Sequence, residues 1–128
     1  MIRNFEIVEA VGLSFEAGYF DLHNDYKIAD LWNNGGNFHI RFQRLPDSVG
    51  GQDVEIVFFG VCFLESDVLP ANGRNLFISE IGYKNPDDVD YDWLLSEFLS
   101  TTEDHLFFRF DADHFLRIFA KIAEAKIV

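Results

Sequence analysis

DVEIVFFGVCFLES, residues 53–66, is a nearly uninterrupted apolar segment: ten of the eleven residues from Val54 to Leu64 are apolar or glycine, and Glu55 is the only charge. Because β-branched and aromatic residues dominate, the pattern favours a strand over a buried helix. Gly60 would also cost about 1 kcal/mol in a helix interior. Both alternating faces are apolar, so we expect a central strand that is covered on both sides for most of its length.

Other segments with period-two alternation predict strands around this one. NFHIRFQRL alternates Phe38, Ile40 and Phe42 with polar residues, and the turn sequence NNGG at 33–36 should join it to the strand before it. The expected strands cover residues 4–9, 11–19, 26–32, 37–45, 54–64, 75–84 and 105–110. A slip of phase at Glu80 predicts a bulge in the strand at 75–84.

Two segments in the C-terminal third have apolar residues at helical spacing. Residues 88–100 follow Asn85-Pro86 and carry acidic residues at the expected N-terminus, which favours a helix. Residues 111–126 begin at a capping Asp111 and place Phe115, Ile118, Phe119 and Ile122 on one stripe, which predicts a terminal helix.

This order of elements predicts a single α+β domain over residues 1–128. It would be a mostly antiparallel sheet of about six or seven strands with the two C-terminal helices packed on one face. The apolar central strand leaves alternatives open for the second face. Either sheet curvature or a second protomer covers it, or the sheet curls towards a half barrel.

The charge balance narrows the classes of partner. The chain has 22 acidic and 10 basic residues, a net charge of −12, and nine acids against the single base Arg109 lie between residues 87 and 113. Such a field repels nucleic acids and anionic membranes and attracts basic proteins. Cys62 is the only cysteine, which excludes an intrachain disulfide, and without an apolar signal segment we expect a cytoplasmic protein. Within the apolar strand Cys62 should be buried and unreactive.

The sequence shows no motif for catalysis, a cofactor or a metal. Asp21, His23 and Asp25 would share one face if extended, but they read better as a polar turn. The run from Asp88 to Asp92 starts like an EF-hand calcium loop, yet its sixth position is Trp93 rather than glycine. A third cluster, around the junction of the last strand and last helix, has no nucleophile nearby; it consists of His105, Asp111, Asp113 and His114.

We therefore expect a protein-binding module rather than an enzyme, with an acidic surface for a basic partner. That surface comprises Asp87, Asp88, Asp90, Asp92, Glu97, Glu103 and Asp104. In size and charge the chain resembles the small acidic immunity proteins that neutralise basic nuclease toxins of bacteria. The alternatives are a homo-oligomeric scaffold, with a homodimer covering the Phe-rich sheet, or a ligand-binding protein or enzyme using His23, His39 or His105 in a pocket between sheet and helices.

Overall fold

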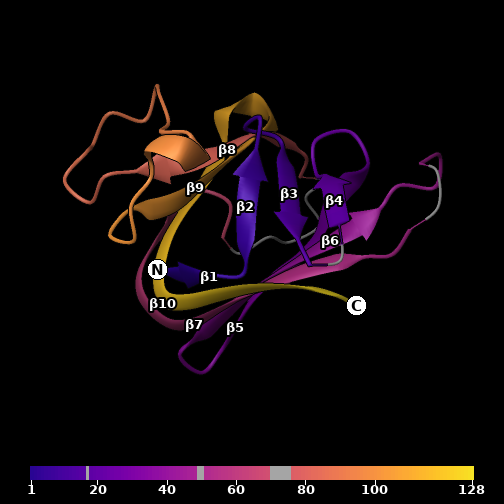
Figure 1. The fold of residues 1–128 in the computed structure, drawn as a ribbon, viewed down its shortest axis with the longest axis horizontal. Coiled ribbons are helices and arrows are strands. Elements are labelled where there is room, and N and C mark those ends of the chain that lie inside the picture. The colour runs from indigo at the N-terminus through magenta and orange to yellow at the C-terminus, as the bar shows by residue number, and fades with distance from the viewer. Residues whose placement is uncertain (17, 49–50, 70–75) are drawn as a thin grey trace.

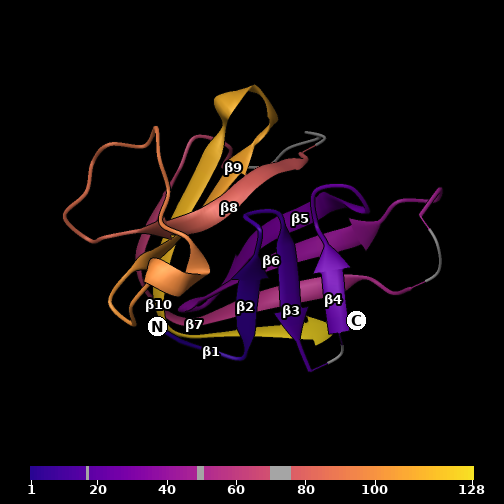
Figure 2. The same ribbon diagram turned by 45° about the horizontal axis from the view of Figure 1, so that its top comes forward.

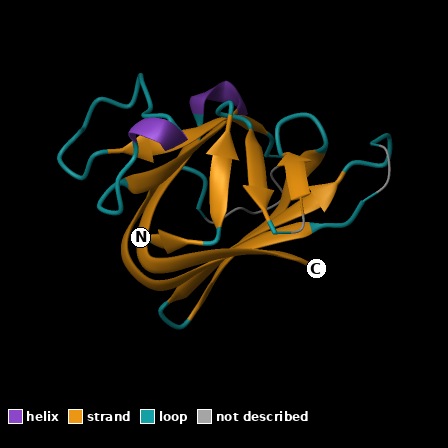
Figure 3. Cartoon of the chain, viewed as in Figure 1, coloured by secondary structure: helices purple, strands orange, loops and turns teal. Residues whose placement is uncertain are grey.

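The computed structural model describes residues 1–16, 18–48, 51–69 and 76–128. Strands account for 61% of the structure and short 3-10 turns for 5%, so the protein is nearly all β (Figure 3). The elements are β1 (Ile2–Arg3), β2 (Phe5–Val8), β3 (Gly12–Phe15), β4 (Gly18–Asp21), β5 (Tyr26–Asn34), β6 (Asn37–Arg44), β7 (Val54–Ser66), β8 (Ile78–Lys84), η1 (Glu97–Leu99), β9 (His105–Phe110), η2 (Asp111–Asp113) and β10 (Phe115–Ile127).

These strands form two sheets. The large sheet has the order β5-β6-β7-β10-β9-β8, all antiparallel, and β1 adds to β10 in parallel. The small sheet is the meander β2-β3-β4. Figures 1 and 2 show the large sheet strongly curled, with the small sheet lying across its concave side. The curled sheet, one of the alternatives that the sequence left open, is therefore the one found.

The curl is built into β7 and its neighbour β10. Gly60 has a left-handed φ of 66°, and the pairing of the two strands shifts register between Phe119 and Ala120, so that Cys62 is an extra residue on β7. Inward-facing residues on β7 therefore run Ile56, Phe58 and then Val61, not in strict alternation. The expectation of a buried Cys62 is wrong, because this bulge turns its side chain outwards, where it is exposed.

One hydrophobic core lies between the two sheets. The small sheet contributes Phe5, Ile7 and Leu13, and the large sheet contributes fully buried residues such as Phe58 and Phe108. The central strand is buried on both sides only in its first part, from Val54 to Phe58; farther along, Phe63 is exposed. Two-sided coverage was predicted for most of the strand, and it extends only from Val54 to Phe58.

The terminal helix predicted over 111–126 is wrong, because that segment is the strand β10. It pairs with β7 along its whole length and with β9 over its first four residues. Its core residues alternate as Leu116, Ile118 and Ala120, and after a change of face at Lys121 as Ala123 and Ala125. This change of face gives the apolar residues the spacing of a helical stripe. The long ladder with β7 and the short one with β9 outweigh the helix propensity of Ala, Lys and Glu.

The helix predicted over 88–100 is also wrong. Only Glu97–Leu99 form a single 3-10 turn, and the rest is irregular. Side chains take the backbone hydrogen bonds that a helix would use: the Asp88 carboxylate accepts from the amide of Asp90, and the Asp90 carboxylate from that of Asp92. The α+β class is therefore corrected to nearly all β, with no α-helix among the residues that the structure describes.

Most of the predicted strands are confirmed. The NNGG turn joins β5 to β6, with Gly35 at a φ of 67°, and the predicted bulge near Glu80 appears as a register shift between Ile78 and Glu80. The strand predicted over 11–19 is instead two strands, since the chain reverses before Gly18. Residue 75, and most of the loop predicted over 67–74, lie outside the described residues. The described part contains no helix long and apolar enough to cross a membrane.

Candidate functional site

Residues 85–93, which we call the strap, fold over the outer surface of β8, β9 and β10. Three cations from these strands hold its main-chain carbonyls. Arg117 donates to the carbonyls of Asp88, Asn85 and Pro86, at 2.7, 3.1 and 3.3 Å. Lys84 donates to those of Asp90 and Trp93, and Arg109 to that of Tyr91. The strap is thus fixed by the buried Lys84 and Arg117 and the partly buried Arg109, and not by a helix.

Aromatic rings and charges pack together beneath the strap. Tyr91 meets Phe107 and Phe115 edge to face, both with ring centroids 5.3 Å away. The Lys84 ammonium lies 3.6 Å from the centroid of the Trp93 ring and is fully buried. Tyr91 also donates its hydroxyl to Glu65, and burial followed by that carboxylate raises the pKa of the tyrosine. The strap therefore covers a second, smaller packed layer.

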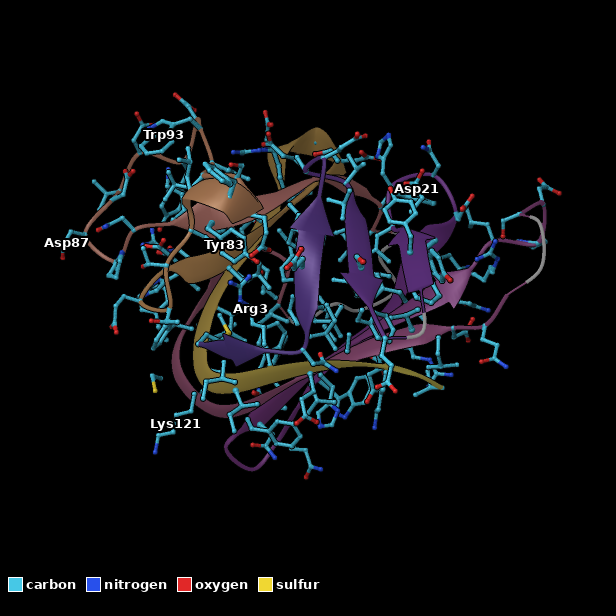
Figure 4. All side chains as sticks on the ribbon, in the orientation of Figure 1. Arg3, Asp21, Tyr83, Asp87, Trp93 and Lys121 are labelled. Carbon is cyan, nitrogen blue, oxygen red and sulfur yellow. The ribbon has the colours of Figure 1, made fainter. Side chains whose placement is uncertain are left out.

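The structure divides the seven acidic residues that were predicted to form one surface. Glu97 and Asp104 serve internal hydrogen bonds, and Asp88 pairs with Lys84 at 3.2 Å. The amide of Asp90, followed by the Lys84 ammonium, holds the pKa of Asp88 below its usual value. The remaining four are exposed, and Figure 4 shows Asp87 at the outer end of the strap. They are Asp87, Asp90, Asp92 and Glu103.

A groove that sequence reasoning missed lies between the small sheet and the edge of the large one, with a volume of about 750 Å³. We call it the acidic groove. One wall is β2 with the turn after it, and the other is the segment that follows the strap together with β8. It is lined by Glu6, Ile7, Val8, Glu9, Ala10, Glu80, Ile81, Leu94, Leu95, Ser96, Glu97 and Phe98.

Backbone contacts fix both walls of the acidic groove. The amide of Ile81 donates to the carbonyl of Ala10 at 2.7 Å, and Tyr83 and Leu95 exchange two hydrogen bonds of 2.9 and 2.8 Å. Gly82 permits this closeness, because a Cβ there would lie 2.6 Å from Leu94 Cβ and 2.9 Å from the Leu95 carbonyl oxygen. The groove is therefore a formed feature of the fold.

Glu97, one of the residues that line the acidic groove, is held by three hydrogen bonds. Its Oε1 accepts from the Tyr83 hydroxyl at 2.6 Å, the Ile7 amide at 2.8 Å and Arg3 Nη1 at 3.0 Å. The Arg3 guanidinium also lies over the Tyr83 ring, 4.6 Å from its centroid, and the two residues appear side by side in Figure 4. This cluster ties together β1, β2, β8 and η1.

Among the residues that the structure describes, the lining of the acidic groove combines apolar side chains with carboxylates and includes no cation. Glu80 and Glu97 pair with arginines, Arg109 and Arg3, at 3.3 and 3.0 Å. Glu6 and Glu9 are exposed and make no ion pair within the described residues. The groove can therefore hold a group that has both an aliphatic part and a positive charge.

The structure separates the other polar clusters of the sequence or engages them in internal contacts. Asp21 accepts two bonds from Asn24, as expected for a turn; burial opposes these bonds, but they lower the pKa of Asp21 below its usual value. His105 and His114 lie at opposite ends of β9, and His114 pairs instead with Asp67 at 3.1 Å. No group of three or more His, Cys, Asp or Glu residues suited to a metal occurs among the residues described.

His39 lies on β6, on the face of the large sheet that points away from the core, and takes part in a row of polar contacts. Its ring stacks on Trp32 with centroids 4.6 Å apart, and its Nδ1 lies 3.3 Å from Glu55 Oε2. Lys126 Nζ approaches the same carboxylate oxygen at 3.4 Å. These contacts explain how Glu55 is buried within an apolar strand.

Sequence reasoning missed the acidic groove because its walls come from residues 6–10, 80–81 and 94–98. A signal exists in FEIVEA, residues 5–10, where acids interrupt an apolar strand pattern. That signal marks Glu6 as outward-facing, but it shows neither the turn that carries Glu9 nor the residues opposite them. Comparison of the chain with protein-family models, curated proteins and solved structures finds no match.

Proposed function

We propose that this chain is a protein-binding module whose acidic groove takes a lysine or arginine side chain of a partner protein. The observation that carries the proposal is the pairing of an apolar lining with the carboxylates of Glu6 and Glu9, neither of which has an ion-pair partner in the described structure. An aliphatic stem can lie on Leu94 and Leu95, which are partly exposed, while its charge meets the carboxylates of the rim. The proposal relocates the expected contact from the strap to the groove.

The overall charge supports a basic partner. With a net charge of −12, the chain attracts cationic proteins over a distance and speeds their association at low salt. The strap acids Asp87 and Asp92 contribute to this field, although they line no part of the acidic groove. We place the encounter in the cytoplasm, since one cysteine allows no intrachain disulfide.

Selection from a random peptide library displayed on phage, with the purified protein as target, tests the proposal. We expect the enriched peptides to share a lysine or arginine. Their affinity should fall at least about tenfold, roughly 1.4 kcal/mol, in the double variant Glu6→Gln/Glu9→Gln. High salt should weaken binding to the wild type more than binding to that variant.

The matched control is Asp87→Asn/Asp92→Asn, which removes the same amount of charge from the strap. It should bind the peptides nearly as well as the wild type, because neither residue touches the groove. Equal losses of peptide affinity in both double variants would mean that net charge alone causes the effect, and they would overturn the groove as the binding site. A loss confined to the strap variant would overturn it too and return the contact to the strap.

Self-association is a second candidate, favoured by a specific observation. Ile2 and Ile122 are directly paired on β1 and β10, both are exposed, and Phe63 is exposed on the neighbouring β7. A copy of the chain could cover this strip, as the homodimer alternative expects. Light scattering across a concentration series tests self-association. A constant monomer mass removes this candidate, whereas a dimer that dissociates in the Ile122→Asp variant supports it.

A further inference from the structure

Phe98, at the rim of the acidic groove, is the most exposed large apolar side chain among the described residues. Its exposed fraction is 93%, and that of its neighbour Leu99 is 61%. A phenylalanine buries on the order of 150–250 Å² when covered. Leaving the ring in water therefore forgoes a large favourable free energy of burial. Such an exposed ring beside a polar rim is typical of a contact surface.

The exposure of Phe98 is imposed by an anchored turn. Glu97, the residue before it, is held by the three hydrogen bonds from Tyr83, Ile7 and Arg3. Within the turn, the Leu99 amide donates to the Ser96 carbonyl, and both the amide and the hydroxyl of Ser100 donate to the Glu97 carbonyl, at 2.8–3.2 Å. The ring is thus presented in a fixed place, which lowers the entropic cost of binding to it.

The position of Phe98 relates it directly to the carboxylates. It lines the same groove as Glu6, Glu9 and Glu80, so a group seated against the acids passes the ring. By charge complementarity the occupant of the groove is cationic, and the ring adds an apolar contact next to that cation. Together, the carboxylates and the Phe98 ring select a narrower class of partner segment than either feature would alone.

We infer that the acidic groove reads a segment of a partner protein in which a lysine or arginine is accompanied by a nearby apolar side chain, and that Phe98 is the residue that recognises the apolar one. This inference rests on the proposed function and specifies its partner. The cation supplies attraction and orientation at Glu6 and Glu9. The apolar residue covers Phe98 and supplies most of the desolvation energy.

The same peptide selection, repeated on Phe98→Ala, tests the inference. On the wild type we expect enriched peptides that carry a basic residue with an apolar residue at a constant spacing. On Phe98→Ala the basic residue should persist and the apolar preference should disappear. The affinity of the wild-type peptides should fall at least about tenfold in this variant.

Val89→Ala is the matched control, because Val89 is 87% exposed and lies in the strap, outside the groove. It should select the same peptides as the wild type, with unchanged affinity. An identical motif on the wild type and on Phe98→Ala would overturn the inference while leaving the groove's role for the cation intact. Loss of the basic residue from the wild-type motif would instead overturn the proposed function.

Discussion

Arg117 donates its Nε–H to His105 Nδ1 across 2.9 Å, and both side chains are buried under the strap. The imidazole can accept this bond only when Nδ1 carries no proton, so the folded protein requires a neutral His105. The two Nη groups of the same guanidinium donate hydrogen bonds to three main-chain carbonyls of the strap. One histidine therefore stands next to the donor that fixes residues 85–88.

The first prediction concerns the dependence of stability on pH. Burial, followed by the charge of Arg117, lowers the pKa of His105 below its usual 6.5, while Asp104 opposes the shift. As pH falls through 6.5, the unfolded chain binds the proton before the folded one does. This contribution to stability is complete above 6.5 and is lost as pH falls from 6.5 towards the folded pKa. Urea unfolding along a pH series should show the loss.

His105→Asn is the control for that series, because an amide oxygen can accept from Arg117 without titrating. The difference in unfolding free energy between the two proteins should change between pH values above and below 6.5. Every other ionisable group is present in both proteins, so its contribution cancels in this difference. A difference that stays constant across the range contradicts the assignment of His105.

The second prediction concerns Lys84, which is fully buried. Lys84→Met leaves the Asp90 and Trp93 carbonyls without their donor and Asp88 without its cation, which should cost about 2–3 kcal/mol. Amide hydrogen exchange should also become faster within the strap. Lys121→Met, at an exposed lysine, should change stability by less than about 0.5 kcal/mol. Equal effects would mean that the strap is not held by this ammonium.

The third prediction concerns Gly82, where Leu94 and Leu95 approach β8 closely. Gly82→Ala should destabilise the fold by about 1–3 kcal/mol through overpacking, and it should weaken selected peptides by displacing one wall of the acidic groove. Gly36→Ala is the control, since nothing lies within 4 Å of the Cβ position there. Thermal unfolding and peptide titration measure both effects; an unchanged Gly82→Ala protein would contradict the close packing.

The strands could be predicted from the sequence where local pattern and local pairing agree. The NNGG turn and the alternation at residues 38–42 each determine a hairpin within about twenty residues of chain. β10 could not be predicted this way, because most of its pairing is with β7, which is distant in sequence, and only its first four residues pair with the neighbouring β9. The change of face at Lys121 also interrupts the alternation of inward and outward residues that identifies a strand.

The site was less predictable than the fold. Net charge indicated a basic partner, but charge counted along the sequence cannot distinguish an exposed acid such as Asp87 from Glu97, which accepts three internal hydrogen bonds. The conformation of the strap also could not be predicted from the charges along the sequence. Its acids are followed by amides that they cap, and the cations that bind its carbonyls lie on three separate strands.

The last prediction distinguishes a strand from a helix at the C-terminal segment. Ala123 and Ala125 are both buried, and Ala123 pairs with Phe58 on β7, whereas Glu124 between them is exposed. Ala123→Leu and Ala125→Leu should each destabilise the protein by about 1–3 kcal/mol, and Glu124→Leu by less than about 0.5 kcal/mol. Residues two apart lie on nearly opposite sides of a helix, so a helix cannot bury both alanines in one core and spare the glutamate. Chemical denaturation of the three variants gives the answer: a large loss at only one alanine would favour the helix.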